Sequence, residues 1–182
     1  MEHFPAGDLR QRMKTPLTPA TALGFLRQIA SALDAIHSVG VLHRDLKPAN
    51  VMLRADGTLS LIDFGLAKAN ENDISLTGTR EIFGTPYYMS PEQGHAEIID
   101  ARSDLYSLGV VFYEMLIGRK PFNGATAMEV IYKHKRAELP EIAAEFAPYE
   151  GLLRRLLAKS PDKRYQSAGE LLAAIAGLKM PA

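Results

Sequence analysis

Apolar residues recur at helical spacing in the first part of the chain, where they form one continuous stripe (Leu23, Leu26, Ile29, Ala30, Leu33 and Ile36). Thr18 followed by Pro19 is typical of a helix start, because a threonine side chain caps the first turn and proline fits the first helical position. Gly40 follows the stripe and is a common helix terminator. The pattern therefore predicts a helix from Pro19 that ends before Gly40 and buries one face.

The second half of the chain predicts four more helices. Residues 103–115 are apolar on nearly every side, which is typical of a buried central helix, and Gly118 and Pro121 are expected to stop it. The remaining helices are expected at residues 125–135, 150–158 and 167–178, with Pro161 as a break. A short basic helical stretch is expected within residues 1–16. By contrast, residues 64–92 show little periodicity, and a loop of that length is usually functional.

Residues 50–63 consist of two short apolar runs around Asp56-Gly57, which is a strong hairpin signal. We expect a two-residue turn at this dipeptide. That turn sets the register, which pairs Arg54 with Leu59, Val51 with Ile62, and Asn50 with Asp63. Opposed residues of an antiparallel pair lie about 5 Å apart.

The expected register brings an amide oxygen and a carboxylate together at the open end of the hairpin. Oxygen ligands in this arrangement suit Mg²⁺, which takes one or two protein oxygens together with phosphates and water. The alternative is an ordinary hairpin with polar ends. The fold class expected from all these elements is α+β and predominantly α, a helical bundle with one small β-hairpin that carries the candidate site.

Composition limits the possible functions. The chain has 182 residues, of which 47% are hydrophobic and 23% charged, and the formal net charge is zero. This is the balance of one soluble domain, and it gives no bulk electrostatic reason to expect nucleic acid or membrane as a partner. There is no cysteine, which excludes disulfides and thiolate metal sites. We expect a cytoplasmic location, since no signal segment opens the chain.

Sequence motifs flank the hairpin on both sides. His43-Arg44-Asp45-Leu46-Lys47-Pro48-Ala49-Asn50 precedes it, and Asp63-Phe64-Gly65 ends it. Gly84-Thr85-Pro86-Tyr87-Tyr88-Met89-Ser90-Pro91-Glu92 comes later, followed by Asp104 and Arg164. In this order and spacing the chain resembles the serine/threonine protein kinase family, in its bacterial type. The resemblance covers residues 1–178 as the C-terminal lobe, with an activation loop at 63–92 and a tail at 179–182.

The resemblance implies the catalytic roles. Asp45 would accept the proton of the attacking hydroxyl or orient that hydroxyl, and Lys47 would steady the transferring phosphoryl group. Asn50 and Asp63 would hold the Mg²⁺ ions (Mn²⁺ is an alternative) that bridge the phosphates of ATP.

The resemblance also implies a nucleotide site. Met52 would form the apolar floor beneath the adenine ring, with Leu9 and Val51 as packing neighbours. A simple packing role in the core of the hairpin is equally compatible with the positions of Val51, Leu9 and Met52. Asp8 matches an acid that contacts the ribose, although a helix N-cap role fits it equally well.

Regulation is expected on the activation loop. Phosphorylated Thr77 or Thr79 would pair with Arg44 and order the loop, unless both threonines are plain polar loop residues. Thr85 resembles the threonine that hydrogen-bonds Asp45 and Lys47 and favours hydroxyl substrates.

Several residues are expected to be scaffold. Glu92 and Arg164 resemble a buried ion pair, and Asp104 resembles the carboxylate that anchors the catalytic-loop backbone. His43 is expected to pack on Phe64. Tyr87 and Tyr88 are expected in the core.

The chain departs from the family because it contains no Gly-x-Gly-x-x-Gly and no Val-Ala-Ile-Lys segment. We therefore expect the N-terminal lobe to be absent. Two hypotheses follow. The chain is either a kinase catalytic lobe that transfers the ATP γ-phosphate to Ser/Thr hydroxyls of proteins and is inactive alone, or a non-catalytic kinase-like module. The uncovered lobe surface, including Met52 and Leu9, would bind an N-lobe partner or self-associate.

Overall fold

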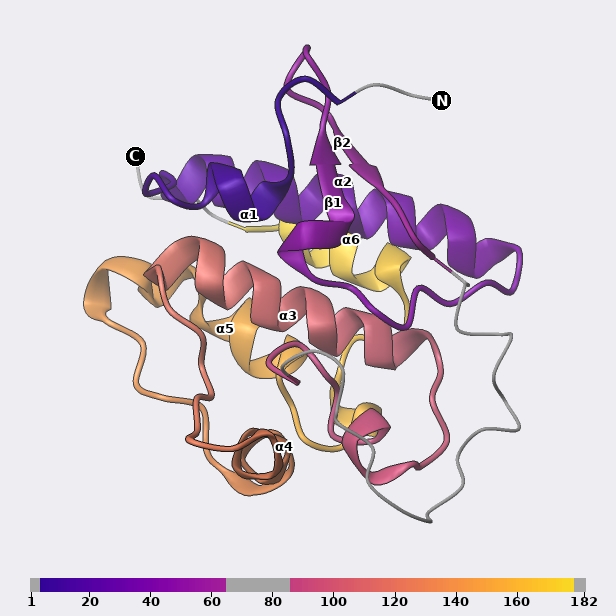
Figure 1. The fold of residues 1–182 in the computed structure, drawn as a ribbon, viewed down its shortest axis with the longest axis vertical. Helices are drawn as coiled ribbons and strands as arrows, with labels where there is room; N and C mark the ends of the chain where they lie inside the picture. Colours follow the sequence, from indigo (N-terminus) through magenta and orange to yellow (C-terminus); the bar gives the residue numbers. More distant parts are fainter. Residues whose placement is uncertain (1–3, 65–85, 179–182) are drawn as a thin grey trace.

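The computed structural model describes residues 4–64 and 86–178. Among these residues it contains six α-helices and one two-stranded antiparallel sheet (Figure 1). The elements are α1 (Leu9–Arg12), α2 (Pro19–Ser38), β1 (Val51–Leu53), β2 (Leu59–Leu61), α3 (Ala101–Ile117), α4 (Ala127–Arg136), α5 (Ala147–Leu156) and α6 (Ala168–Ala176). Short 3₁₀ turns lie at Pro48–Asn50, Gln93–His95, Ala144–Phe146 and Pro161–Lys163. The expected mostly helical fold with one hairpin is confirmed.

Helix α2 has the start and the buried face that the sequence predicts. The Thr18 hydroxyl oxygen accepts a hydrogen bond from the Thr21 amide at 3.2 Å, and Pro19 is the first helical residue. Gly40 has a φ of +74°, a left-handed conformation that glycine adopts without steric cost and that follows the end of the helix. The buried residues include Leu26, Ile29 and Leu33.

Helix α3 is the buried central helix, with 13 of its 17 residues buried. It ends before Gly118, whose φ is +76°. The predicted start at Ser103 is wrong by two residues, because the Asp100 carboxylate caps the helix by accepting the Arg102 amide at 2.8 Å. Asp104 is not the cap, since its carboxylate bonds a loop described below.

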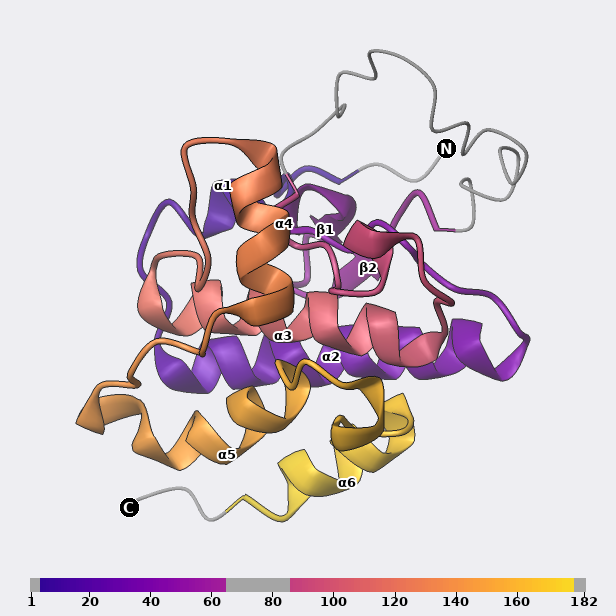
Figure 2. The same cartoon turned by 90° about the horizontal axis from the view of Figure 1, so that it is seen from below.

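The remaining helices surround the pair formed by α2 and α3. Figures 1 and 2 show α2 and α3 running alongside each other, with α5 and α6 packed against them and α4 at one edge. Between α3 and α5 the backbones approach closely at Gly109, where an added Cβ would lie 2.7 Å from the Leu156 Cβ. Buried side chains from all these helices except α4, together with α1 and both strands, form one hydrophobic core.

The hairpin has a different register from the predicted one. Val51 pairs with Leu61, Met52 with Ser60, and Leu53 with Leu59. The loop has three residues rather than two. The Gly57 amide donates to the Arg54 carbonyl at 3.0 Å, which closes a turn. Gly57 then adopts a φ of +81°, as the last residue of a three-residue hairpin loop commonly does. The predicted pairs are therefore wrong by one residue. Arg54 lies opposite Thr58, and Asn50 lies opposite Ile62, whose amide donates to the Asn50 carbonyl at 3.0 Å.

The segment before α1 adds a short bridge beside β1. Asp8 pairs with Met52, and the Leu53 amide donates to the Gly7 carbonyl at 2.9 Å. Leu9 is fully buried and Met52 is half-buried, so the expectation that the lobe surface leaves Leu9 uncovered is wrong. Leu9 is enclosed because it is the first residue of α1, which packs on the hairpin.

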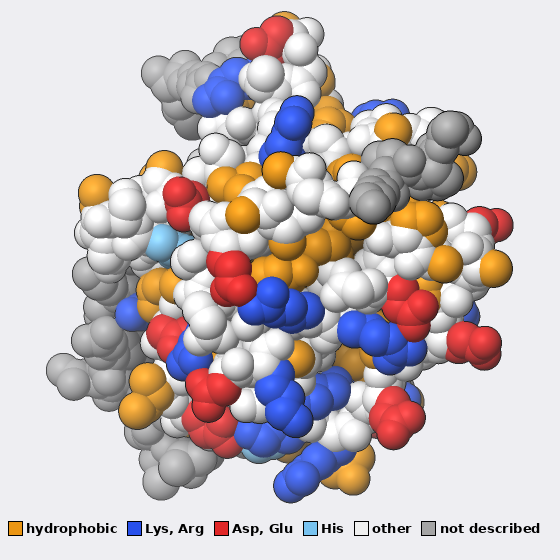
Figure 3. Space-filling view, turned by 180° about the vertical axis from the view of Figure 1, so that it is seen from behind, with side chains coloured by type: hydrophobic (Ala, Val, Ile, Leu, Met, Phe, Trp, Pro, Cys, Tyr) orange, Lys and Arg blue, Asp and Glu red, His pale blue; other side chains and the backbone are white. Residues whose placement is uncertain are grey.

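Exposed apolar side chains occur on several separate elements. The large ones are Val39, Phe64, Ile98, Met128 and Tyr132. On the face opposite to that of Figure 1, apolar side chains occupy the middle and Lys and Arg gather below them (Figure 3). No helix within residues 4–64 and 86–178 has the length and hydropathy needed to cross a bilayer.

Candidate active site

The loop before the hairpin is fixed to the central helix by one carboxylate. Asp104, which is buried near the start of α3, accepts the backbone amides of His43 at 2.8 Å and Arg44 at 2.9 Å. His37 on α2 contacts the same carboxylate at 2.8 Å through Nε2. The expected anchoring of the loop by Asp104 is confirmed.

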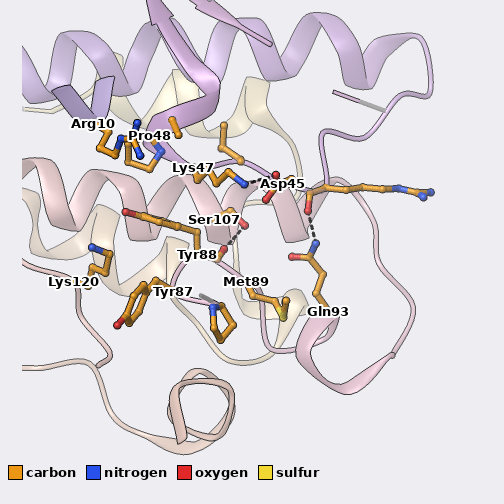
Figure 4. Close-up of a pocket in the computed structure, with 14 residues that line it drawn as sticks. Arg10, Asp45, Lys47, Pro48, Tyr87, Tyr88, Met89, Gln93, Ser107 and Lys120 are labelled. Atoms are coloured by element: carbon orange, nitrogen blue, oxygen red, sulfur yellow. Dashed lines mark hydrogen bonds and ion pairs between the residues drawn. The ribbon is translucent and has the colours of Figure 1, made fainter. Parts of the chain in front are cut away.

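The other side of this loop is held by Gln93, a residue to which the sequence analysis gave no role. Its side-chain amide donates to the Arg44 carbonyl at 2.7 Å (Figure 4). Its oxygen accepts the Ser90 amide and hydroxyl, each at 3.0 Å, so the side chain has one orientation. Arg44 has a φ of +68°, a conformation that costs energy for a non-glycine residue and therefore needs such support.

Three of the predicted catalytic residues lie together. Lys47 Nζ donates to Asp45 Oδ2 at 2.7 Å, and Asn50 Nδ2 donates to the same oxygen at 3.1 Å and to the Asp45 carbonyl at 2.8 Å. The 3₁₀ turn after Lys47 brings Asn50 back toward Asp45, with the Asn50 amide donating to the Lys47 carbonyl at 2.9 Å. The Asp45 side chain is 60% exposed, which leaves its carboxylate accessible to a substrate.

Asp63 lies one residue beyond the paired end of the hairpin. It is exposed and has a φ of +58°, which is uncommon for a non-glycine residue. It follows Ile62, the residue opposite Asn50, so the two predicted metal ligands are near neighbours in the ladder but are not directly opposed. The described residues contain no group of three or more His, Cys, Asp or Glu side chains arranged to hold a metal. The predicted regulatory residues Thr77, Thr79 and Thr85 lie outside the described residues.

A pocket of about 380 Å³ opens beside Asp45. Its described lining consists of Arg10, residues 44–49, residues 86–89, Gln93, Ser107 and Lys120. In Figure 4, Asp45 and Lys47 lie on one side, whereas Arg10 and Lys120 lie toward the other end. Tyr87 and Tyr88 form part of the wall. Tyr88 also packs against the hydrophobic core, whereas Tyr87 does not, so the expectation that both belong to the core is wrong for Tyr87 alone.

Tyr88 is fixed by a network behind the pocket wall. Its hydroxyl donates to Glu114 at 2.6 Å, and its carbonyl accepts the Ser107 hydroxyl at 2.6 Å. Burial, reinforced by the neighbouring Glu114, raises the pKa of Tyr88 and keeps it protonated as a donor. Lys120 donates to the other Glu114 oxygen at 2.9 Å and lies 4.9 Å from the centre of the Tyr87 ring.

The predicted ion pair between Glu92 and Arg164 is present and buried. The guanidinium makes two bonds to the carboxylate, at 2.6 and 2.9 Å, and the Ser103 hydroxyl adds a third at 2.6 Å. Burial alone would raise the pKa of Glu92, but the hydrogen bonds from Arg164 and Ser103 outweigh it and hold the pKa below its ordinary value. The pair ties the end of the loop at Glu92 to the turn before α6.

His43 is buried, with an exposed fraction of 1%, and its Nδ1 lies 3.4 Å from the Asp45 amide. Burial lowers the pKa of His43, although Asp104 and Asp45 oppose the shift, which favours a neutral ring. The backbone of Ile62 also opposes this lowering of the pKa. It does not meet the distance and angle limits of a hydrogen bond to His43 Nε2. Phe64 is 45% exposed, and its expected packing on His43 stays a prediction.

The predicted nucleotide residues have distinct environments. Asp8 is the N-cap of α1, since its Oδ1 accepts the Gln11 amide at 2.7 Å, which supports the capping alternative. Met52 is half-buried beside Asp8. Leu9 and Val51 are fully buried, so their observed role is hairpin packing and they offer no surface to a ligand.

Comparison with known proteins gives a consistent picture. The family model described as "Protein kinase domain" matches residues 1–174. The serine/threonine-protein kinase PknB of Mycobacterium tuberculosis is 39% identical over 180 residues, which cover 95% of this chain and 29% of that protein. A probable serine/threonine-protein kinase of Streptomyces coelicolor is 40% identical over 179 residues, covering 94% of this chain and 26% of that protein.

The chain thus spans less than a third of the length of these relatives. The family match nevertheless includes the loop at residues 43–50, the hairpin, helices α1 to α5 and most of α6. This chain belongs to the protein kinase domain family and has the fold of the C-terminal lobe.

Proposed function

We propose that this chain is the catalytic lobe of a serine/threonine protein kinase, which transfers the γ-phosphoryl group of ATP to Ser or Thr hydroxyls of proteins. The arrangement of Asp45, Lys47 and Asn50 is the observation that carries the proposal. At the edge of a pocket, one oxygen of the exposed Asp45 carboxylate accepts hydrogen bonds from the Lys47 ammonium at 2.7 Å and from the Asn50 amide at 3.1 Å. The pocket leaves space beside the carboxylate for a substrate hydroxyl.

Each of these groups has a role in phosphoryl transfer. The Asp45 carboxylate would orient the attacking hydroxyl and take its proton. The Lys47 ammonium, held 2.7 Å from Asp45, would offset the negative charge of the transferring group. Because the Asp104 and Gln93 side chains hold the backbone on both sides of Arg44, Asp45 has a fixed position before substrate arrives.

The chain also offers oxygen ligands of the type that Mg²⁺ prefers. The Asn50 amide and the Asp63 carboxylate are hard donors at the end of the hairpin nearest Asp45, and they fit a site completed by nucleotide phosphates and water. Bound Mg²⁺ would neutralise the charge of the ATP phosphates. Met52 would lie below the adenine ring.

We expect the isolated chain to be inactive. Residues 1–182 contain neither a glycine-rich segment to cover the phosphates nor the lysine strand that grips the nucleotide. Positioning by these parts supplies much of the catalysis in phosphoryl transfer. A small lobe, supplied by fusion or as a separate chain, would complete the site.

The test compares the isolated chain with the same chain fused to the small lobe of the 39% identical mycobacterial relative. Both are incubated with Mg-ATP and a generic basic protein substrate, and phosphoamino acids are identified. We expect phosphoserine or phosphothreonine from the fusion and none above background from the isolated chain. Turnover by the isolated chain would refute the requirement for a small lobe. No transfer by a folded fusion would instead favour a non-catalytic binding module.

A further inference from the structure

The pocket beside Asp45 has a cationic end. Arg10 comes from α1 and Lys120 from the segment after α3, and both line the pocket. Figure 4 places them toward the same end, on the far side of Pro48 and Tyr88 from Asp45. Lys120 Nζ lies 5.7 Å from the centre of the Tyr88 ring.

The acidic partners of these two cations do not line the pocket. Asp8 contacts Arg10 at 3.2 Å, but its side chain is only 12% exposed, whereas that of Arg10 is 68% exposed. Glu114 contacts Lys120 at 2.9 Å and is 15% exposed, whereas Lys120 is 25% exposed. The positive groups therefore lie nearer to solvent than the carboxylates behind them.

The carboxylates are also committed to other donors. One Asp8 oxygen caps α1 through the Gln11 amide at 2.7 Å, and one Glu114 oxygen accepts the Tyr88 hydroxyl at 2.6 Å. A basic side chain of a peptide would meet Arg10 and Lys120 before either acid, because both carboxylates are less exposed than the cations that they contact. An anionic side chain would meet the cations first and would share them with Asp8 and Glu114.

We propose that this end of the pocket selects protein substrates that carry a carboxylate or phosphorylated side chain near the acceptor hydroxyl. Arg10 and Lys120 are the residues that recognise the anion. The inference rests on the proposed function, since it assumes that the acceptor hydroxyl lies at Asp45. The anion would make charge-assisted hydrogen bonds with the two cations.

The test measures the affinity of peptides for the chain by fluorescence anisotropy, which does not depend on phosphoryl transfer. The peptides share one Ser in a neutral sequence, and a single Glu, phosphoserine or Lys is moved through the flanking positions. At one or two positions we expect Glu to tighten binding about two- to fivefold over Gln, and phosphoserine to tighten it more. The gain should shrink as salt is raised, because the cations are partly solvated.

Variants assign the effect to the two side chains. Arg10→Gln and Lys120→Met should each remove about half of the Glu-over-Gln preference. Glu114→Gln should increase that preference, because it releases Lys120 from its partner. Arg12→Gln on α1 and Lys133→Met on α4 remove the same charge away from the pocket lining and should leave the preference unchanged.

Equal affinity for the Glu, Gln and Lys peptides would overturn the proposal, as would a preference for Lys. The proposal would also be overturned if Arg12→Gln and Lys133→Met reduced the Glu preference as much as Arg10→Gln and Lys120→Met do. Bulk charge would then be the cause of the preference. Failure of the fusion to phosphorylate protein would count against the proposed function alone. The peptide preference is a binding measurement, so its outcome does not depend on phosphoryl transfer by the fusion.

Discussion

At the residue scale, the backbone around Arg44 is held from two directions. Asp104 binds its amide at 2.9 Å and Gln93 binds its carbonyl at 2.7 Å, although Gln93 lies 49 residues away in the sequence. The next residue is Asp45. A shift of the Arg44 peptide would move the Asp45 carboxylate, so we assign Gln93 as a positioning residue for the proposed reaction.

We predict that Gln93→Met lowers kcat about tenfold in the fusion with a small lobe, because small misplacements of a reacting group are costly. KM for ATP should change little, since the Gln93 side chain contacts the Arg44 carbonyl and Ser90, which are not among the proposed nucleotide residues. Gln93→Glu should not restore kcat, because a carboxylate cannot donate to the Arg44 carbonyl. Steady-state kinetics measure both constants.

Gln28→Met is the matched control. It removes a side-chain hydrogen bond of similar length, which the Leu59 amide donates to Gln28 at 2.9 Å, and neither residue lines the pocket. Its kcat should equal that of the unaltered fusion. If Gln93→Met also keeps full kcat, the positioning role is wrong.

Some site residues were predictable and others were not. Asp45, Lys47 and Asn50 lie within six residues, so one local turn brings them together and the sequence motif identifies them. Gln93, Arg10 and Lys120 reach the pocket only through tertiary packing. No local pattern marks them, and the adjacency of Gln93 to Glu92 was the single available signal.

At the element scale, helices were predicted better than the hairpin register. Caps such as Thr18 and terminators such as Gly118 act within one turn, so their signals are local. The register depended on whether Gly57 occupied the second or the third loop position. Asp-Gly is compatible with both, and the structure has the three-residue form.

Two glycines in helices should respond oppositely to alanine. At Gly109 in α3 an added Cβ would meet Leu156 at 2.7 Å, so Gly109→Ala should lower the free energy of unfolding by about 1–3 kcal/mol. At Gly24 in α2 nothing lies within 4 Å of the added Cβ, so Gly24→Ala should raise it by about 0.5–1 kcal/mol. Urea unfolding followed by circular dichroism measures both. Equal effects would contradict the close approach of α3 and α5.

His134 connects α4 to the central helix. Its Nδ1 lies 2.9 Å from the Tyr106 hydroxyl, and its ring packs on Phe122. Burial, with the Lys159 charge beside it, lowers the pKa of His134 to about 4, while the nearby Tyr87 carbonyl opposes the shift. The neutral ring is therefore the form that the folded chain contains.

We predict that this histidine makes the chain acid-sensitive. Between about pH 6.5 and pH 4 the unfolded chain binds a proton at His134 that the folded chain does not, so stability falls as pH falls. The contribution is on the order of 3 kcal/mol across that window. His134→Phe should flatten the dependence, measured as urea midpoints at several pH values. Exposed His95→Gln is the control and should keep the slope of the unaltered chain.

At the scale of the whole molecule, the central pair of α2 and α3 supports the site from below. The hairpin lies above α2 (Figure 1). Asp104 near the start of α3 accepts the amides of His43 and Arg44 in the loop before the hairpin. The Glu92–Arg164 pair then connects the end of the loop to the turn before α6. One scaffold thus presents Asp45 on one side of the pocket and two cations toward its other end.

The central claim is that Asp45 receives or orients the substrate hydroxyl in phosphoryl transfer. The most direct measurement is the single-turnover rate of phosphoryl transfer to a Ser peptide by the small-lobe fusion, with and without Asp45→Asn. We predict a fall of about 10²–10⁴-fold for Asp45→Asn, with Mg-ATP affinity retained. An equal rate in the two proteins, with the variant folded and ATP bound, would contradict the account.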